Sequence, residues 1–225
     1  MKDSDYRFCL LNDDYFMQAK SCLIKVFIKN EPMGKHLKLS EHELTEFVEG
    51  LLIHAFPQKL SWIAIDKSTE KLVAVRVLTD AFNDYSPSIR SSENFKIIFN
   101  FLESLYINHE HILQVKKATL LHTWMTAVKE EHHQKGLLKA LFKHGAHWAK
   151  KQGFQHCIGE ATNIHNLNFL KKYTQFSELN SIEYKKFAYN NSYPFQNLEE
   201  HFEGALYYYP LEYFPEVEKD IFAIN

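Results

Sequence analysis

The stretch VKEEHHQKGLLKALF, residues 128–142, decides the fold because its character changes abruptly in the middle. It continues a run of β-forming residues, TLLHTWMTAV at residues 119–128, and ends in a pattern whose apolar side chains recur every three or four positions. Gly136 stands where that helical pattern begins. The stretch predicts a strand, a short polar turn and an amphipathic helix, and two kinds of site suit the turn: a metal site or an anion site.

The spacing of the histidines and glutamates argues against a metal site. The glutamates and histidines at residues 130–133 are consecutive, whereas helical metal sites place their ligands four residues apart, as in H-E-x-x-H. His109 and His111 form a second pair without a third ligand nearby in the sequence. We interpret both groups as polar residues of solvated loops and expect no metal.

The start of the helix suits an anion better. A helix N-terminus has unpaired N–H groups and about half a positive charge, so it binds phosphate groups. Gly136 lets the backbone come close to a ligand, and Lys135 adds a cation. The sequence has neither the G-x-x-x-x-G-K-[ST] motif nor the G-x-G-x-x-G motif, so the phosphate belongs to some other ligand.

The rest of the chain alternates strands with helices and predicts one α+β domain. We expect strands at residues 6–11, 61–66, 71–78, 119–128, 154–161 and 178–187, and helices at residues 13–28, 41–54, 91–107, 135–152 and 166–172. A capping box from Ser40 to Glu43 begins the second helix, and a break follows the first helix at residues 30–34. We assign residues 1–190 to the domain and residues 191–225 to a C-terminal extension that packs on it, as a late strand or a covering segment.

Composition narrows the function of the 225-residue chain. The 26 Lys and Arg residues nearly balance the 28 Asp and Glu residues, which argues against nucleic-acid binding. Cys9, Cys22 and Cys157 form no CxxC pair, as expected of a protein in a reducing compartment. The sequence has no apolar run of membrane-spanning length, so we expect a cytoplasmic protein that binds no membrane.

The order of elements around the quoted stretch resembles that of the GNAT superfamily of N-acetyltransferases. In that family a [Q/R]-x-x-G-x-[G/A] turn holds the pyrophosphate of acetyl-coenzyme A, and the preceding strand binds the pantetheine arm through its backbone. HQKGLL at residues 133–138 stands in that place. Gly136 matches the central glycine, while His133 and Leu138 depart from the motif. The resemblance implies a single GNAT-like domain with a central mixed, mostly antiparallel sheet flanked by helices.

The same resemblance implies acetyl-coenzyme A as the co-substrate and indicates which residues hold it. These are the end of the strand, the turn and one residue of the next short helix: Met125, Thr126, Ala127, Val128, His133, Gln134, Lys135, Gly136, Leu137, Leu138, Lys139 and Asn166.

A second segment, FIKNEPM at residues 27–33, is similar to the FFKDEPL-like stretch of insect arylalkylamine N-acetyltransferases. The resemblance implies that Glu31 is the general base that takes a proton from the amine. The alternative is that Glu31 only closes a turn before Pro32. Many family members also have a tyrosine acid in an L-Y-E-K-x-G-F stretch, but here Lys171 stands at its position and Tyr173 is displaced by two residues.

His122 is a second catalytic candidate, because it lies on the coenzyme strand where vertebrate relatives look to have a histidine. Its ordinary pKa suits proton transfer near neutral pH. A packed strand histidine is the alternative. Strict alternation along the strand puts one set of side chains on one face and a second set on the other: His122, Trp124 and Thr126 against Thr123, Met125 and Ala127.

These observations predict an N-acetyltransferase that moves the acetyl group of acetyl-coenzyme A to a small primary amine, with arylalkylamines as candidates, by direct attack with a general base. A same-fold alternative acetylates a polyamine, an antibiotic or a protein amine. A non-catalytic acyl-coenzyme A-binding module is the alternative that the departures at His133 and Leu138 support. The expected partner is a small-molecule amine, and the family suggests a homodimer.

Overall fold

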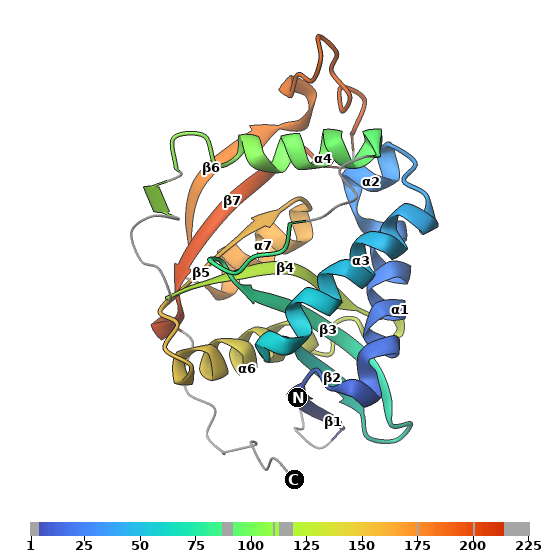
Figure 1. Ribbon diagram of the computed structural model, residues 1–225, viewed down its shortest axis with the longest axis vertical. Coiled ribbons are helices and arrows are strands. Elements are labelled where there is room, and N and C mark those ends of the chain that lie inside the picture. The colour runs from blue at the N-terminus through green and yellow to red at the C-terminus, as the bar shows by residue number, and fades with distance from the viewer. Residues whose placement is uncertain are drawn as a thin grey trace.

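Within the described residues a seven-stranded sheet runs through the molecule in the order β1-β2-β3-β4-β5-β7-β6 (Figure 1). The structure is a computed structural model that describes residues 5–86, 92–109, 111–112, 119–174, 176–199 and 201–213. The strands are β1 (Tyr6–Leu10), β2 (Trp62–Asp66), β3 (Lys71–Asp80), β4 (Leu120–Val128), β5 (His156–Ala161), β6 (Ser177–Glu183) and β7 (Glu203–Pro210). β4 and β5 run parallel and the other neighbouring strands antiparallel, which confirms the predicted mixed sheet.

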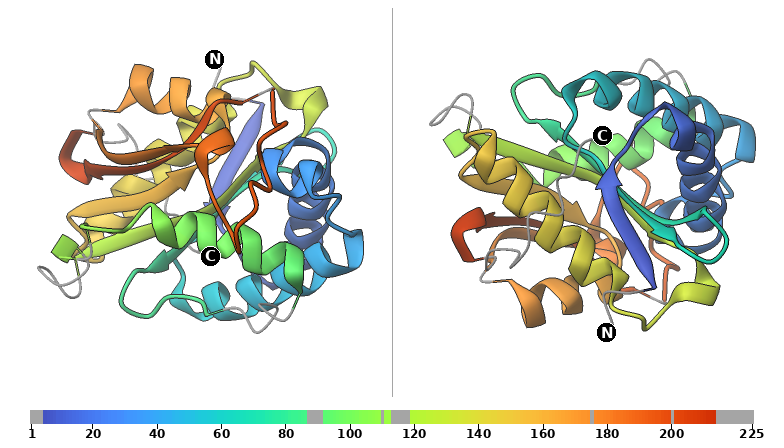
Figure 2. Two further views of the ribbon diagram at one scale, coloured as in Figure 1. Left: turned by 90° about the horizontal axis from the view of Figure 1, so that it is seen from above. Right: turned by 90° about the horizontal axis from the view of Figure 1, so that it is seen from below.

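Helices cover both faces of this sheet. They are α1 (Asp13–Asn30), α2 (Pro32–His36), α3 (Glu41–Ala55), α4 (Glu93–Ser104), α6 (Leu137–Lys151) and α7 (Ile164–Tyr173). Figure 2 shows α6 and α7, in yellow and orange, on one face, and α1 and α3, in blue and cyan, on the other. Phe95 and Phe99 of α4 share a hydrophobic core with α1 and α3, while Phe142 of α6 packs in a second core on the opposite face. The predicted α+β class is confirmed.

The helices form where the sequence places apolar residues on one side and a cap at the start. In α1 the buried residues Tyr15, Ala19 and Cys22 recur at the spacing of a helix face. At the start of α3, Ser40 Oγ accepts the backbone N–H of Glu43 (3.2 Å), and Glu43 Oε2 accepts the backbone N–H of Ser40 (2.9 Å). Each side chain thus satisfies a donor that the helix leaves unpaired, as the capping box predicts.

Two segments differ from the prediction. The break expected at residues 30–34 contains the start of α2, because Pro32 suits the first helical position and Glu31 caps the helix. The strand expected at residues 178–187 ends at Glu183 and continues as a short 3₁₀ turn. The expected helix at residues 91–107 is α4, although Ser91 lies outside the described residues.

The C-terminal part of the described chain contributes an interior strand to the sheet. β7 follows residue 190 in the sequence but pairs with β5 on one side and β6 on the other. A strand with two neighbours has its backbone N–H and C=O groups satisfied on both edges. The division at residue 190 stays a prediction, and β7 is part of the same sheet as β1–β6.

β4 and β5 separate part-way along their length. They pair only from Leu120 to Thr123 of β4, against His156 to Gly159 of β5. β4 then continues beside β3 as far as Val128, and β5 continues beside β7. The register between β3 and β4 shifts between Val77 and Leu78, so Trp124 is an extra residue on β4. The parallel strands therefore open into a gap beside this bulge.

We expect Ser40→Ala to lower the free energy of unfolding by about 1 kcal/mol, because the N-cap bond of α3 is lost. Asn12→Ala is the matched control, since Asn12 is the N-cap of α1 and makes no side-chain capping bond. Urea denaturation followed by far-UV circular dichroism measures both values. Equal losses in the two variants would contradict a specific role for the α3 capping box.

Candidate active site

A pocket opens where β4 and β5 separate. It encloses about 1120 Å³, including the space at its mouth, and the separating ends of both strands line it. On the face covered by α1, α3 and α4 its wall includes Phe27, Phe47 and Phe99. On the face covered by α6 and α7 it includes Leu138 and Phe169. The pocket therefore passes through the sheet from one face to the other.

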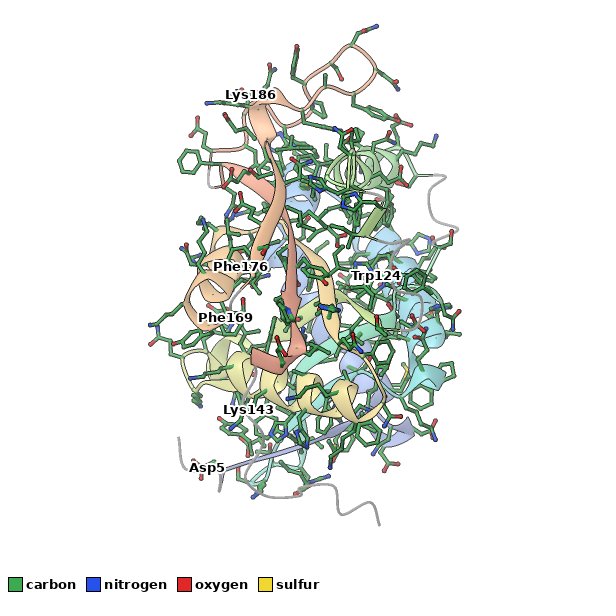
Figure 3. The ribbon with its side chains drawn as sticks, turned by 90° about the vertical axis from the view of Figure 1, so that its left-hand side faces the viewer. Asp5, Trp124, Lys143, Phe169, Phe176 and Lys186 are labelled. Carbon is green, nitrogen blue, oxygen red and sulfur yellow. The ribbon has the colours of Figure 1, made fainter. Side chains whose placement is uncertain are left out.

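Figure 3 shows this arrangement with the sheet seen close to its edge. Trp124, on the bulge of β4, lies to one side of the central strands, and Phe169 of α7 lies to the other. Both residues belong to the pocket wall. Two ligands that enter from opposite faces can therefore meet in the gap between the strands.

The turn before α6 has the features of an anion site. Gly136 is the N-cap of α6 with a φ of 76°, a left-handed conformation that glycine adopts without strain. No side-chain capping bond occupies the first N–H groups of this helix. Residues 133–136 are exposed, and His133 Nε2 lies 3.0 Å from the carbonyl oxygen of Val128, which fixes the turn against the end of β4. The open N–H groups and the charge of Lys135 suit a phosphate group.

Glu31 lies between α1 and α2 and faces the pocket. Its Oε2 atom accepts the backbone N–H of Gly34 at 2.5 Å, as an N-cap does. Its Oε1 atom is buried and has no hydrogen-bond partner among the described residues. Burial raises the pKa of Glu31, and this effect exceeds the opposing influence of the backbone N–H groups of Gly34 and Met33 and of the Thr162 side chain. A carboxylate held in this way on an apolar pocket wall can accept a proton.

His122 of β4 is buried between two carboxylates, one of which, Glu160, lines the pocket. Its Nδ1 atom is 2.6 Å from Asp84 Oδ2, and its Nε2 atom is 3.2 Å from Glu160 Oε2. Burial by itself lowers the pKa of His122, but the charges of Glu160 and Asp84 raise it well above its ordinary value. The imidazole is therefore a cation at neutral pH that donates a hydrogen bond to each carboxylate.

The two carboxylates have further partners. Asp84 Oδ1 accepts hydrogen bonds from Thr79 Oγ1 (2.8 Å) and from the indole N–H of Trp124 (2.5 Å). Burial raises the pKa of Asp84, but the charge of His122 and the hydrogen bonds to Asp84 together lower it below its ordinary value. Tyr106 donates its hydroxyl to Glu160. Glu160 also lines the pocket, so this network holds one carboxylate in the pocket wall.

No protein-family model matches the sequence, and no curated protein matches it. Solved structures do. The C-terminal condensation domain of Ebony, in complex with beta-alanyl-dopamine, has a TM-score of 0.83 and 14% identity over 91% of this chain and 98% of that chain. A putative arylalkylamine N-acetyltransferase from the mosquito Aedes aegypti has a TM-score of 0.78 and 16% identity over 92% of this chain and 87% of that chain. A polyamine N-acetyltransferase of Drosophila melanogaster has a TM-score of 0.73 and 15% identity over 92% of this chain and 100% of that chain.

The chain has the fold of the GNAT N-acetyltransferases. At these sequence identities the likeness concerns the fold, and the chemistry rests on the residues of the pocket. The pocket brings together five of the residues that the sequence proposed for this site, which are Glu31, Met125, Thr126, Leu138 and Asn166. The other proposed coenzyme residues follow β4 into the exposed turn and the first turn of α6.

The sequence predicted that side chains alternate strictly between the two faces of β4, but the structure shows that they do not. Thr123 hydrogen-bonds Arg76 and lies on the α6 side, whereas Met125 and Ala127 pack in the core beneath α1 and α3. The bulge at Trp124 reverses the alternation within the strand, which explains the correction. Thr126 lines the pocket, so the bulge also decides which side chains face a ligand.

Tyr173, two residues from the usual position of the tyrosine acid, lies outside the pocket wall and is 40% exposed. Its ring is flanked by the ammonium groups of Lys139 and Lys172, at 4.8 and 5.2 Å from the ring centroid. It therefore stands on the surface between α6 and α7, and it is not placed to protonate a group inside the gap.

Sequence reasoning missed the residues that surround His122, and it also missed Tyr207 of β7. Asp84, Tyr106 and Glu160 converge on one point from three separate segments, and Tyr207 enters the pocket wall from β7. Glu160 occurs in a predicted strand, but nothing in the sequence pairs it with His122. Asp84 follows β3, Tyr106 follows α4 and Glu160 lies on β5, so only the tertiary structure brings these residues to His122.

The described residues contain neither a metal-binding group nor a membrane-spanning helix. No group of three or more His, Cys, Asp or Glu side chains among them is arranged to hold a metal ion. None of their helices is both long enough and apolar enough to span a bilayer.

The raised pKa of His122 predicts a specific pH dependence of stability. A group that binds its proton more tightly in the folded state contributes fully below its unfolded pKa of about 6.5, and the contribution is lost as pH rises toward the folded pKa. We therefore expect the stability difference between the wild type and His122→Gln to be largest at about pH 6 and to shrink as the pH rises into the alkaline range. Chemical denaturation across this range measures it. His42→Gln, at an 81% exposed side chain, is the control, and a pH-independent difference for His122→Gln would contradict the buried cation.

Proposed function

We propose that the chain is an acetyl-coenzyme A-dependent N-acetyltransferase for a small primary amine with an apolar body. The observation that carries the proposal is the pocket that passes through the sheet between β4 and β5. A thioester and an amine must meet at one carbon atom, and a pocket open toward both faces lets each arrive from its own side. The arylalkylamine and polyamine N-acetyltransferases with this fold support the same class of reaction.

The α6 side suits the coenzyme. Beyond Thr123, β4 pairs with β3 on one edge only. The backbone from Met125 to Val128 therefore offers a pantetheine arm the groups on its other edge, apart from the Val128 carbonyl oxygen that His133 contacts. The turn around Gly136 then receives the pyrophosphate, with Lys135 and Lys139 as nearby cations. Leu138 and Asn166, in the pocket wall, would contact the arm itself.

The opposite side suits the amine. Its wall is aromatic and apolar, with Phe27, Phe47 and Trp124 among its members. Such a wall binds the body of an arylalkylamine by excluding water, while a carboxylate attracts the ammonium group. Glu31, between α1 and α2, provides that carboxylate in the pocket wall.

Glu31 then acts as the general base. An alkylammonium with a pKa of about 10 must lose a proton before it attacks a thioester. Burial raises the pKa of Glu31 toward that of its partner, which makes the proton transfer easier. The neutral amine attacks the carbonyl carbon, and backbone N–H groups of β4 stabilise the oxyanion.

His122 has a different role from the one that its ordinary pKa suggests. A cationic imidazole cannot accept a proton, and both of its nitrogen atoms already face carboxylates. We therefore assign His122 to holding Glu160 in the pocket wall, with Asp84 fixing the opposite side of the ring.

A second candidate acceptor follows from Glu160. A pocket with two carboxylates, Glu31 and Glu160, suits an amine that carries a second cation, such as agmatine, which a solved relative with this fold acetylates. A non-catalytic acyl-coenzyme A-binding module is the alternative of a different class. We retain the cytoplasm as the expected location and a homodimer as the expected assembly.

Thiol release from acetyl-coenzyme A across a panel of arylalkylamines and polyamines tests the proposal. We expect turnover in the wild type and a loss of about 10²-fold or more in kcat/KM for Glu31→Gln, the usual contribution of a general base. The rate should rise with pH as Glu31, whose pKa is raised, loses its proton. The variant should lack this rise. Glu41→Gln, at an exposed position of α3, is the control. Tight coenzyme binding without turnover of any amine would indicate the binding module instead.

Glu160→Gln separates the two kinds of acceptor. If a second ammonium or guanidinium group binds Glu160, the variant raises KM for agmatine by about tenfold and leaves KM for a phenylethylamine within about twofold. Steady-state kinetics with the two amines measures the ratio. An equal change for both amines would show that Glu160 does not distinguish a second cation.

A further inference from the structure

Arg76 of β3 is a buried cation without a carboxylate partner. It is 1% exposed, and it forms no ion pair with any described residue. Its Nη2 atom donates to Tyr209 Oη at 2.8 Å and to Thr123 Oγ1 at 2.9 Å, and its Cζ atom lies 3.5 Å from the centre of the Phe142 ring. Its Nε atom has no hydrogen-bond partner in the described chain. A buried charge without a countercharge is unfavourable, so a negative charge formed nearby would be stabilised.

Tyr207 of β7 places a hydroxyl group at the point where the central strands separate. The side chain is 3% exposed and lines the pocket. A Cβ atom at Gly159 would lie 2.6 Å from the Tyr207 hydroxyl oxygen and 3.0 Å from the backbone oxygen of Thr123. Gly159 and Thr123 are the last paired residues of β5 and β4. Because residue 159 has no side chain, the hydroxyl group can occupy the apex of the gap.

Thr123 connects this hydroxyl group to Arg76. Its Oγ1 atom accepts a hydrogen bond from Arg76 and lies 3.3 Å from Cys157 Sγ. Burial raises the pKa of Tyr207, while the charge of Arg76 and the side chain of Thr123 oppose that rise. The phenol is therefore protonated at neutral pH, and its anion would form beside a fixed cation.

We propose that Tyr207 is a catalytic residue that donates its phenolic proton to the thiolate leaving the thioester, and that Arg76 is a positioning residue that stabilises the negative charge through Thr123. The inference rests on the proposed acetyltransferase function. It assigns the acid to β7, whereas the exposed Tyr173 of α7 lies outside the pocket wall.

Each proton in the step has a source and a destination. Glu31 takes one proton from the ammonium group, and the neutral nitrogen forms its bond to the carbonyl carbon. The C–S bond then breaks, its electron pair remains on sulfur, and the Tyr207 proton moves to that sulfur. The nitrogen still carries one excess proton, which restores the phenol. The products are the amide and the free thiol, and Glu31 releases one proton to solvent.

Tyr207→Phe tests the assignment because it removes only the hydroxyl group. We expect kcat with acetyl-coenzyme A to fall by about 10²-fold, at the low end of general-acid effects. With 4-nitrothiophenyl acetate, whose thiolate is a weak base and leaves without a proton, the loss should be less than about threefold. Tyr208→Phe is the matched control, since it removes a hydroxyl group from the next residue of the same strand, which stacks on His156. Its rates should equal those of the wild type with both donors.

Arg76→Lys and Arg76→Met test the positioning role. The lysine variant keeps the charge, so it should retain at least about tenfold more activity than the methionine variant with acetyl-coenzyme A, and the two should differ little with the activated donor. Thermal unfolding and coenzyme binding of every variant show whether the fold and the pocket persist. A variant that unfolds is replaced in the comparison by Thr123→Val, which breaks the link between Arg76 and Tyr207.

The outcomes separate this inference from the proposed function. If the wild type acetylates no amine, both fail. If the wild type is active and Tyr207→Phe matches it, or if Tyr207→Phe loses activity equally with both donors, the acid is not Tyr207 and the proposed function stands. A loss confined to the donor with the basic leaving group supports the assignment.

Discussion

The end of hydrogen bonding between β4 and β5, beyond Thr123 and Gly159, is the constraint on which the rest of the structure depends. Parallel strands that stayed paired would close the sheet, and no ligand could pass between its faces. The bulge at Trp124 increases the local twist of β4 and turns it away from β5. The gap frees backbone groups for a ligand, admits side chains from both faces into one pocket and places the last paired residues at its apex.

The two faces of the sheet carry charges of opposite kinds around this gap. On the α1 and α4 side, Asp84 and Glu160 flank the cation of His122. Two carboxylates around one cation, with Glu31 as a third carboxylate in the pocket wall, give this side an excess of negative charge. On the α6 side, Arg76 is buried without a countercharge, and the exposed turn before α6 adds the helix N-terminus and Lys135. An ammonium group is attracted to the first side, and phosphate or thiolate to the second. Under the proposed function, this separation of charge would set the side from which each substrate enters.

The order of elements could be predicted because local patterns specify it. The capping box at Ser40, the helical spacing in α1 and the glycine at residue 136 are all readable over a few neighbouring positions. The short helix α2 was missed because proline disrupts the interior of a helix, whereas Pro32 occupies the first position, where proline is favoured. The face of each β4 side chain was also missed, because a bulge depends on how β3 pairs with it and leaves no local signature.

The sequence by itself determined the strand, turn and helix that present Gly136 and Lys135, and it determined the place of Glu31 at the end of α1. These features depend on residues close together in the chain. Only the tertiary structure decided that His122 meets Asp84 and Glu160, 38 residues away on either side, and that Arg76 meets Tyr209 across 133 residues. Such contacts follow from sheet order and register, which arise when all the strands pair and bury their faces together.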